Sequence, residues 1–239
     1  MSVNAPDATG VKVEHVVRGS PAEKAGLKDN DKITKVDTAS VATAAEVTRL
    51  VSKHPPGDAV SVTVQRDGKG EITIHATTAA RPTAEAIAKM EHVGTFAPAW
   101  TKLTTVTGTM PGSVQALRGK VALIEFWATW CGPCRLTQPQ LGSLQAKYGP
   151  QGLSVVGITS DDAQAAADHA RKTGMAFAAA SDIDGSTNKA YGVTSLPTLF
   201  VVDKTGVVRD VVVGWEPGQD AKVERIVQAL LAEPAPATP

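Results

Sequence analysis

The sequence is poor in cysteine and has no excess of either charge. Only two Cys occur among 239 residues, and 24 Lys and Arg balance 24 Asp and Glu. Such a balance argues against a basic nucleic-acid-binding arm and against a polybasic membrane patch. A structural zinc site needs about four ligands, and neither the Cys pair nor the five His show ligand spacing. We therefore expect no metal and no nucleic-acid partner.

Aromatic residues are absent from the first 95 positions, and all ten lie between Phe96 and Trp215. The N-terminal core must then be aliphatic, which favours two domains over one. No apolar run approaches the roughly 20 residues that span a bilayer. The first residues, MSVNAPDATG, also lack the basic start and apolar stretch of a secretory signal. We expect either a mature extracytoplasmic protein whose export segment was removed or, alternatively, a cytoplasmic one.

The N-terminal segment has the pattern of a small α+β domain. Ser20 precedes a proline and a capping-box Glu, and Thr43 with Glu46 repeats the capping pattern before a second apolar helix. Alternating apolar residues over 60–64 and 72–74, separated by Asp-Gly, predict a hairpin. Periodicity alone indicates no more than this fold class.

The stretch GVKVEHVVRGSPAEKAGL (10–27), with RDGK at 66–69, resembles a bacterial PDZ domain of the HtrA type over about residues 10–78. PDZ domains bind extended C-terminal peptides by strand addition. In that family the carboxylate-binding loop and groove strand precede the strand that begins here at Val11, where only MSVNAPDAT stands. The resemblance therefore leaves open whether this domain binds a peptide or protein ligand or has a structural or docking role.

The C-terminal segment alternates strands and helices, which predicts an α/β sandwich. Residues 121–127 form a nearly continuous apolar run, as expected for a strand covered on both faces. Asp220 is expected to cap a last helix that carries one apolar stripe. The predicted domains are 1–80 (PDZ-like), 81–93 (linker or short helix), 94–232 (α/β) and 233–239 (a disordered tail rich in Pro and Ala).

Both cysteines lie in one motif, Trp130-Cys131-Gly132-Pro133-Cys134, at a predicted strand-to-helix junction. A helix N-terminus stabilises a thiolate and lowers the cysteine pKa from about 8.5 toward about 7. Cys131 is then the nucleophile and Cys134 resolves the mixed disulfide. Gly132 permits close approach of a partner backbone, and Pro133 suits the first helical position. A purely structural disulfide is disfavoured because so short a loop constrains little.

The run EFWATWCGPCR (125–135), with Pro139 and Ser195-Leu196-Pro197-Thr198, resembles a thioredoxin-fold protein. Residues 94–98, Ser113, 117–120 and 203–206 are similar to the TlpA/ResA-type branch, over about 94–231. The resemblance implies a thiol–disulfide oxidoreductase of the cell envelope or periplasm. It also implies client proteins with disulfides and an upstream dithiol donor as partners. A peroxidase of the peroxiredoxin kind shares the fold but lacks a resolving Cys three residues on.

The resemblance also assigns roles to further residues. Pro197 matches the family's cis-proline beside the Cys pair, with the backbone of Leu196 pairing to an incoming peptide. Glu125 occupies the position of a buried acid. Burial of a carboxylate in this apolar strand is costly unless the group is neutral or used, so it either shuttles the proton of Cys134 or lies solvated at the sheet rim. An apolar substrate patch is expected from Trp130, Leu196, Val213 and Gly214.

These expectations define a reductase of protein disulfides that needs no cofactor beyond its own Cys131–Cys134 pair. The reducing direction follows from the Gly-Pro dipeptide, which is that of thioredoxin, with a potential of about −270 mV. A different class remains as the alternative: a PDZ-based scaffold or adaptor whose thioredoxin fold serves only as a binding module.

Overall fold

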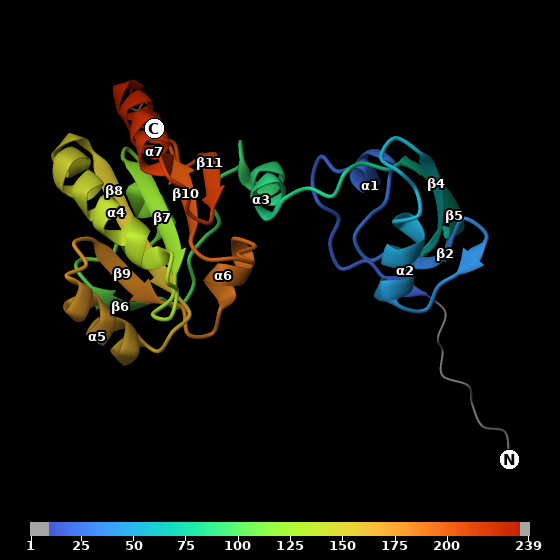
Figure 1. Cartoon of the computed structure of the whole chain (residues 1–239), viewed down its shortest axis with the longest axis horizontal. Coiled ribbons are helices and arrows are strands. Elements are labelled where there is room, and N and C mark those ends of the chain that lie inside the picture. Colours follow the sequence, from blue (N-terminus) through green and yellow to red (C-terminus); the bar gives the residue numbers. More distant parts are fainter. Residues whose placement is uncertain (1–9, 235–239) are drawn as a thin grey trace, which may run out of the picture. The chain divides into compact units, whose positions relative to one another are not determined.

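The computed structural model describes residues 10–234, which divide into two compact units at the boundary between Thr83 and Ala84 (Figure 1). The expected tail at 235–239 and the nine residues before Gly10 lie outside the described part. Within residues 10–234, none of the helices is both long enough and apolar enough to cross a bilayer.

The first unit is a small sheet with two helices. Its elements are β1 (Val11–Lys12), α1 (Pro21–Lys24), β2 (Lys32–Val36), β3 (Ala39–Ser40), α2 (Ala44–Val51), β4 (Ala59–Arg66) and β5 (Gly70–Thr77). The strand order is β1-β2-β4-β5, with β3 on β2 and every pair antiparallel. Both predicted caps are present, since Ser20 and Thr43 accept from the backbone N–H of Glu23 and Glu46.

An aliphatic core and one buried ion pair hold this unit together. The core is formed by Ile33, Val36, Val41, Val60, Val64 and Ile74. Asp31, 1% exposed, accepts two hydrogen bonds from the Arg66 guanidinium at 2.7 and 2.6 Å. Arg66 also donates to the carbonyl of Gly26 at 2.7 Å. The hydrogen bonds from Arg66 lower the pKa of Asp31 and keep it ionised.

The second unit is a six-stranded mixed sheet between helices. Its strands are β6 (Thr104–Thr107), β7 (Val121–Trp127), β8 (Leu153–Thr159), β9 (Ala178–Ser181), β10 (Thr198–Val202) and β11 (Val208–Val213). The helices are α3 (Ala84–His92), α4 (Cys134–Tyr148), α5 (Ala163–Thr173), α6 (Ser186–Ala190) and α7 (Gln219–Ala232), with 3-10 turns η1 (Val114–Leu117) and η2 (Gly149–Gln151). The order is β11-β10-β7-β8-β9-β6 (Figure 1).

The central strand β7 separates two cores. Its seven residues are all buried, and it pairs parallel with β8 and antiparallel with β10. Val121 and Leu123 face a core that includes residues of α4 and α7, whereas Ile124 and Phe126 face the core containing Tyr191. The expected architecture is confirmed: a mixed sheet flanked by helices, preceded in the sequence by a smaller α+β unit.

Helix α3 falls within the segment 81–93 that the sequence assigned to a linker or short helix. In the structure it is part of the second unit. Lys89 bridges Glu85 at 2.7 Å and Asp210 of β11 at 3.0 Å. Glu85 also accepts from the backbone N–H of Val213 at 3.2 Å. These contacts attach the helix to strand β11.

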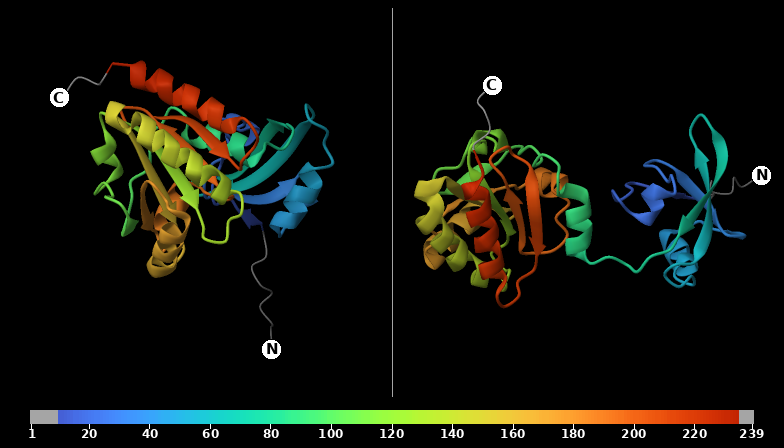
Figure 2. Two further views of the ribbon diagram at one scale, coloured as in Figure 1. Left: turned by 60° about the vertical axis from the view of Figure 1, so that its left-hand side comes forward. Right: turned by 90° about the horizontal axis from the view of Figure 1, so that it is seen from above.

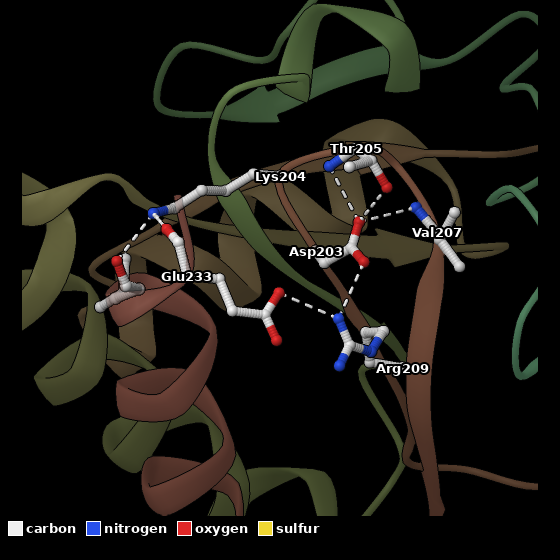
Figure 3. A network of polar contacts seen from close by, with 7 residues as sticks. Asp203, Lys204, Thr205, Val207, Arg209 and Glu233 are labelled. Atoms are coloured by element: carbon white, nitrogen blue, oxygen red, sulfur yellow. Dashed lines mark hydrogen bonds and ion pairs between the residues drawn. The ribbon is translucent and has the colours of Figure 1, made fainter. Parts of the chain in front are cut away.

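A polar network fastens the end of α7 to the β10–β11 turn (Figure 3). Asp203 accepts from the hydroxyl of Thr205 at 2.6 Å and from Arg209 at 3.1 Å. Arg209 also donates to the carboxylate of Glu233 at 3.0 Å, and Lys204 Nζ donates to the Glu233 carbonyl at 2.5 Å. Charged donors thus hold the C-terminal turn of α7, where backbone carbonyls otherwise lack partners.

Candidate functional site: a buried disulfide at a helix N-terminus

The Cys pair lies where β7 ends and α4 begins. Cys131 and Cys134 form a disulfide with Cα atoms 5.3 Å apart, and α4 starts at Cys134 itself. Cys131 is 3% exposed and Cys134 is completely buried. Cys131 is thus the residue of the pair nearer the surface, where a nucleophile that attacks a client must lie.

The helix N-terminus is directed at Cys131. The backbone N–H of Cys134 donates to Cys131 Sγ at 3.2 Å. Thr129, on the loop before the motif, is held by a 2.6 Å bond from its N–H to the carboxylate of Asp161. An amide donor and the positive end of a helix dipole both favour a sulfur anion at Cys131 over the neutral thiol. The arrangement therefore supports thiolate chemistry once the disulfide is reduced.

Trp127 forms the floor of the site, and Trp130 lies at its surface. Trp127 is 1% exposed and belongs to one buried cluster with Cys131 and Cys134. The ring of His169, on α5, lies 5.2 Å from the Trp127 ring. Burial, more than its charged neighbours, lowers the pKa of His169. Trp130 is 73% exposed, so a large apolar side chain stands free beside the disulfide.

Glu125 is fully buried, which excludes the alternative of a solvated carboxylate at the sheet rim. Thr137, one turn into α4, donates its hydroxyl to Glu125 Oε1 at 2.5 Å. The other oxygen, Oε2, has no hydrogen-bond partner among residues 10–234. Burial raises the pKa of Glu125 to about 8, and the Thr137 hydroxyl opposes that rise. Glu125 is therefore mostly protonated at neutral pH.

The Leu196–Pro197 peptide bond is cis, as the resemblance implied. Pro197 lines a cavity of about 320 Å³ together with Glu125, Thr137, Gly214 and Trp215. The backbone N–H of Gly214 donates to the carbonyl of Pro197 at 2.8 Å and fixes that wall. The cavity brings the buried acid and the cis-proline to one space.

The structure places the residues of the expected substrate patch in different surroundings. Leu196 packs against both the cluster that contains the Cys pair and the core that contains Tyr191, and Val213 packs against that second core. Gly214 lines the cavity beside Pro197. Gly132 and Pro133 occupy the turn before α4, where Pro133 has helical φ and ψ of −59° and −33°.

Two further residues contact this site without having been expected there, and one exposed apolar residue lies at the same end of the sheet. Thr137 contacts Glu125, and its position three residues after Cys134 on one helix is a signal that the sequence contained. His169 reaches Trp127 from a helix distant in sequence. Ile183 is 64% exposed and follows the end of β9. Strands β7, β8 and β9 run parallel, and the last residue of β9, Ser181, pairs with Thr159 of β8, which pairs with Trp127.

Known proteins resemble both units. A sequence model of the Redoxin family matches residues 92–230, and one of the PDZ domain matches residues 1–74. Thiol-disulfide oxidoreductase ResA of Bacillus thuringiensis subsp. konkukian is 34% identical over 96 residues, covering 40% of this chain and 56% of ResA. Thioredoxin-like protein YneN of Bacillus subtilis is 35% identical over 119 residues, covering 47% and 66%. The chain thus spans a little over half the length of the ResA relative.

Solved structures agree with the fold of the second unit. A crystal structure from Chlorobium tepidum, described as a thiol:disulfide interchange protein DsbE, is 33% identical with a TM-score of 0.53. It is matched over 57% of this chain and 96% of its own. A thioredoxin-like superfamily protein, SPOA0173, has a TM-score of 0.54 at 21% identity and supports the fold alone. Through residues 92–230, the chain belongs to the Redoxin family.

Proposed function

We propose that the chain is a thiol–disulfide oxidoreductase that reduces disulfides of client proteins. The observation that carries this is the disulfide between Cys131 and Cys134 at the start of α4, where the Cys134 backbone N–H donates to Cys131 Sγ. ResA and the DsbE-type protein, which are named for this chemistry, match the same part of the chain.

The cycle begins with the reduced pair. The Cys131 thiolate attacks one sulfur of a client disulfide, and the other client sulfur leaves as a thiolate. The Cys134 thiol then loses its proton, and its sulfur attacks Cys131 Sγ. The Cys131–Cys134 disulfide forms, the second client thiolate is released, and two electrons have passed to the client. A dithiol donor restores the reduced pair by the reverse exchange.

The ionised fraction of Glu125, the minor form at neutral pH, supplies the base for the second step. An ordinary carboxylate with a pKa of 4.5 is too weak a base for a thiol near 8.5, whereas a pKa of about 8 makes the transfer nearly isoenergetic. Among the described residues, Glu125 Oε2 has no hydrogen-bond partner. The Glu125 side chain also lines the cavity that Pro197 borders. Protonated Glu125 can return its proton to a departing thiolate.

Insulin reduction by dithiothreitol tests this function. Wild-type protein should accelerate the reaction, Cys131→Ser should abolish the acceleration, and Cys134→Ser should accumulate a mixed disulfide because the resolving thiol is missing. Full activity of Cys131→Ser would refute the proposal. Titration of the dithiol against thioredoxin-like and glutathione-like couples decides the direction: a midpoint near −270 mV supports a reductase, and one near −120 mV an oxidant.

The role of the first unit belongs to the same proposal. Its resemblance to PDZ domains supports docking of a partner, and the scaffold alternative assigns the whole function to such docking. A variant with both cysteines replaced by Ser distinguishes the oxidoreductase from the scaffold. Cells that carry this variant should lose the wild-type phenotype if the protein acts as an oxidoreductase, and should keep it if the protein acts only as a scaffold. An extracytoplasmic location is supported by the resemblance to the TlpA/ResA branch and is tested by labelling intact cells with a membrane-impermeant thiol reagent.

A further inference from the structure

Strand β5 closes the sheet of the first unit with an open edge. It ends the order β1-β2-β4-β5, so within residues 10–234 no strand pairs with its outer side. The opposite end, β1, has only two residues, whereas β5 has eight. It forms a long regular hairpin with β4, drawn in teal in Figure 2.

This edge lacks the features by which proteins block strand pairing. Proline, inward-pointing charges and bulges are the usual devices. The sequence of β5, GEITIHAT, contains no proline, and its pairing with β4 is continuous from Ala59↔Thr77 to Arg66↔Gly70. Its only charged residue, Glu71, is exposed, while Ile72 and Ile74 pack toward the core. The strand itself therefore carries no feature that blocks pairing, and helix α1 is the described element outside the sheet that packs against it.

The residues of β5 complement themselves in antiparallel pairing. A two-fold axis that passes through Thr73, perpendicular to the sheet, pairs residues of the two copies whose numbers add up to 146. Side chains that point to one face of the sheet in the first copy then point to the same face in the second copy. Glu71 then lies opposite His75 of the second copy, Ile72 opposite Ile74, and Thr73 opposite itself. Carboxylate–imidazole, aliphatic and Thr–Thr pairs are all favourable across strands.

The contacts already present leave Glu71 and His75 free to make this pair. Ser61 Oγ lies 3.0 Å from His75 Nδ1 and fixes the ring. Among residues 10–234, His75 Nε2 has no partner and can donate to a carboxylate. Glu71 has only a 3.9 Å contact with Lys35, both side chains being largely exposed. Such an exposed pair contributes little and is readily exchanged.

We propose that β5 is a self-association edge, through which two copies of this chain join their first-unit sheets in the register centred on Thr73. The occupant is a second copy because the symmetric register satisfies the one charged residue of the strand. An interface of one strand pair is small, so the dimer should be weak and depend on protein concentration.

A cysteine cross-link tests this register in the full chain, with Cys131 and Cys134 replaced by Ser to remove the native thiols. In Thr73→Cys, the two introduced residues face each other with Cα atoms about 4.5–5.5 Å apart, within disulfide range. Thr77→Cys is the matched control, exposed on the same face of the same strand. Its two copies lie eight residues apart along the strand direction, about 27 Å.

Mild oxidation should convert Thr73→Cys largely to a disulfide-linked dimer, and Thr77→Cys at least 10-fold more slowly. In the otherwise wild-type chain, Glu71→Lys should weaken concentration-dependent dimerisation in sedimentation velocity, and Glu71→Lys with His75→Glu should restore it. Equal cross-linking of both cysteine variants, or a protein that stays monomeric at about 1 mM, overturns the proposal. Capture of a client strand by β5 without self-association would overturn it as well.

Discussion

Replacing Glu125 by Gln should change the stability of the second unit in a strongly pH-dependent way. Burial raises the pKa of Glu125 from 4.5 to about 8. The unfolded chain loses the proton near pH 4.5, whereas the folded protein keeps it until about pH 8. The carboxyl thus stabilises the fold fully below pH 4.5, and this contribution is lost as the pH rises to 8. The amide of the Glu125→Gln variant does not titrate and carries no such dependence.

The magnitude follows from the pKa difference. Each pKa unit corresponds to about 1.4 kcal/mol. Wild type should therefore lose about 3 kcal/mol relative to Glu125→Gln between pH 4.5 and 7, and roughly 4 kcal/mol between pH 4.5 and 9. A constant offset is also expected, because the Gln amide replaces Oε2 at a position with no hydrogen-bond partner among the described residues. The slope with pH, not the offset, carries the prediction.

Denaturant titration of the oxidised protein between pH 5 and 9 measures this difference. All four tryptophans lie in the second unit, so their emission follows its unfolding alone. The disulfide removes thiol ionisation from the balance. Thr137→Val should move the transition to higher pH, because the hydroxyl that lowers the pKa of Glu125 is lost, and Thr137→Ser should not. A difference between wild type and Glu125→Gln that is the same at pH 5 and 9 refutes the reasoning.

Three further outcomes are expected. Ile183→Ser should raise KM for a protein client several-fold, because Ile183 is an exposed apolar residue at the end of the sheet where β7 finishes at Trp127. Phe96 is equally exposed but lies beside the β10–β11 turn, so Phe96→Ser should leave KM unchanged. Equal effects of the two substitutions on KM would contradict this. Reduction of the disulfide should change tryptophan emission, and Trp127→Phe should remove most of that change, since Trp127 belongs to the same buried cluster as the two cysteines. Arg66→Met should destabilise the first unit, because the buried Asp31 carboxylate then keeps the Lys28 backbone N–H but loses its charged partner. Hydrogen exchange of β4 and β5 measures this, and unchanged protection would argue against the ion pair.

Local patterns were sufficient wherever the physical cause is local. Capping residues such as Ser20 and Thr43 act within one helical turn, and both caps formed as expected. The fully apolar run of β7 correctly indicated a strand covered on both faces. The Trp-Cys-Gly-Pro-Cys motif placed the disulfide at the start of a helix because spacing and dipole act over the same few residues.

Assignments that depend on distant contacts were less secure. Val213 alternates between faces with its neighbours, and only the packed sheet shows that its side chain joins the core away from the cavity. Helix α3 has no sequence feature that distinguishes a linker helix from one bound to β11 through Lys89 and Asp210. Asp220 was expected to cap α7, but Gly218 holds the cap position and Asp220 lies in the first turn.

The sequence by itself determined the chemistry of this protein: two cysteines, their spacing, and the proline and acid that accompany them. Only the tertiary structure decided how that chemistry is tuned. The pKa of Glu125 depends on complete burial and on a hydroxyl from another element, Thr137 of α4. Desolvation and hydrogen bonding are set by what the fold brings around a group, and neither is a property of the group's neighbours in sequence.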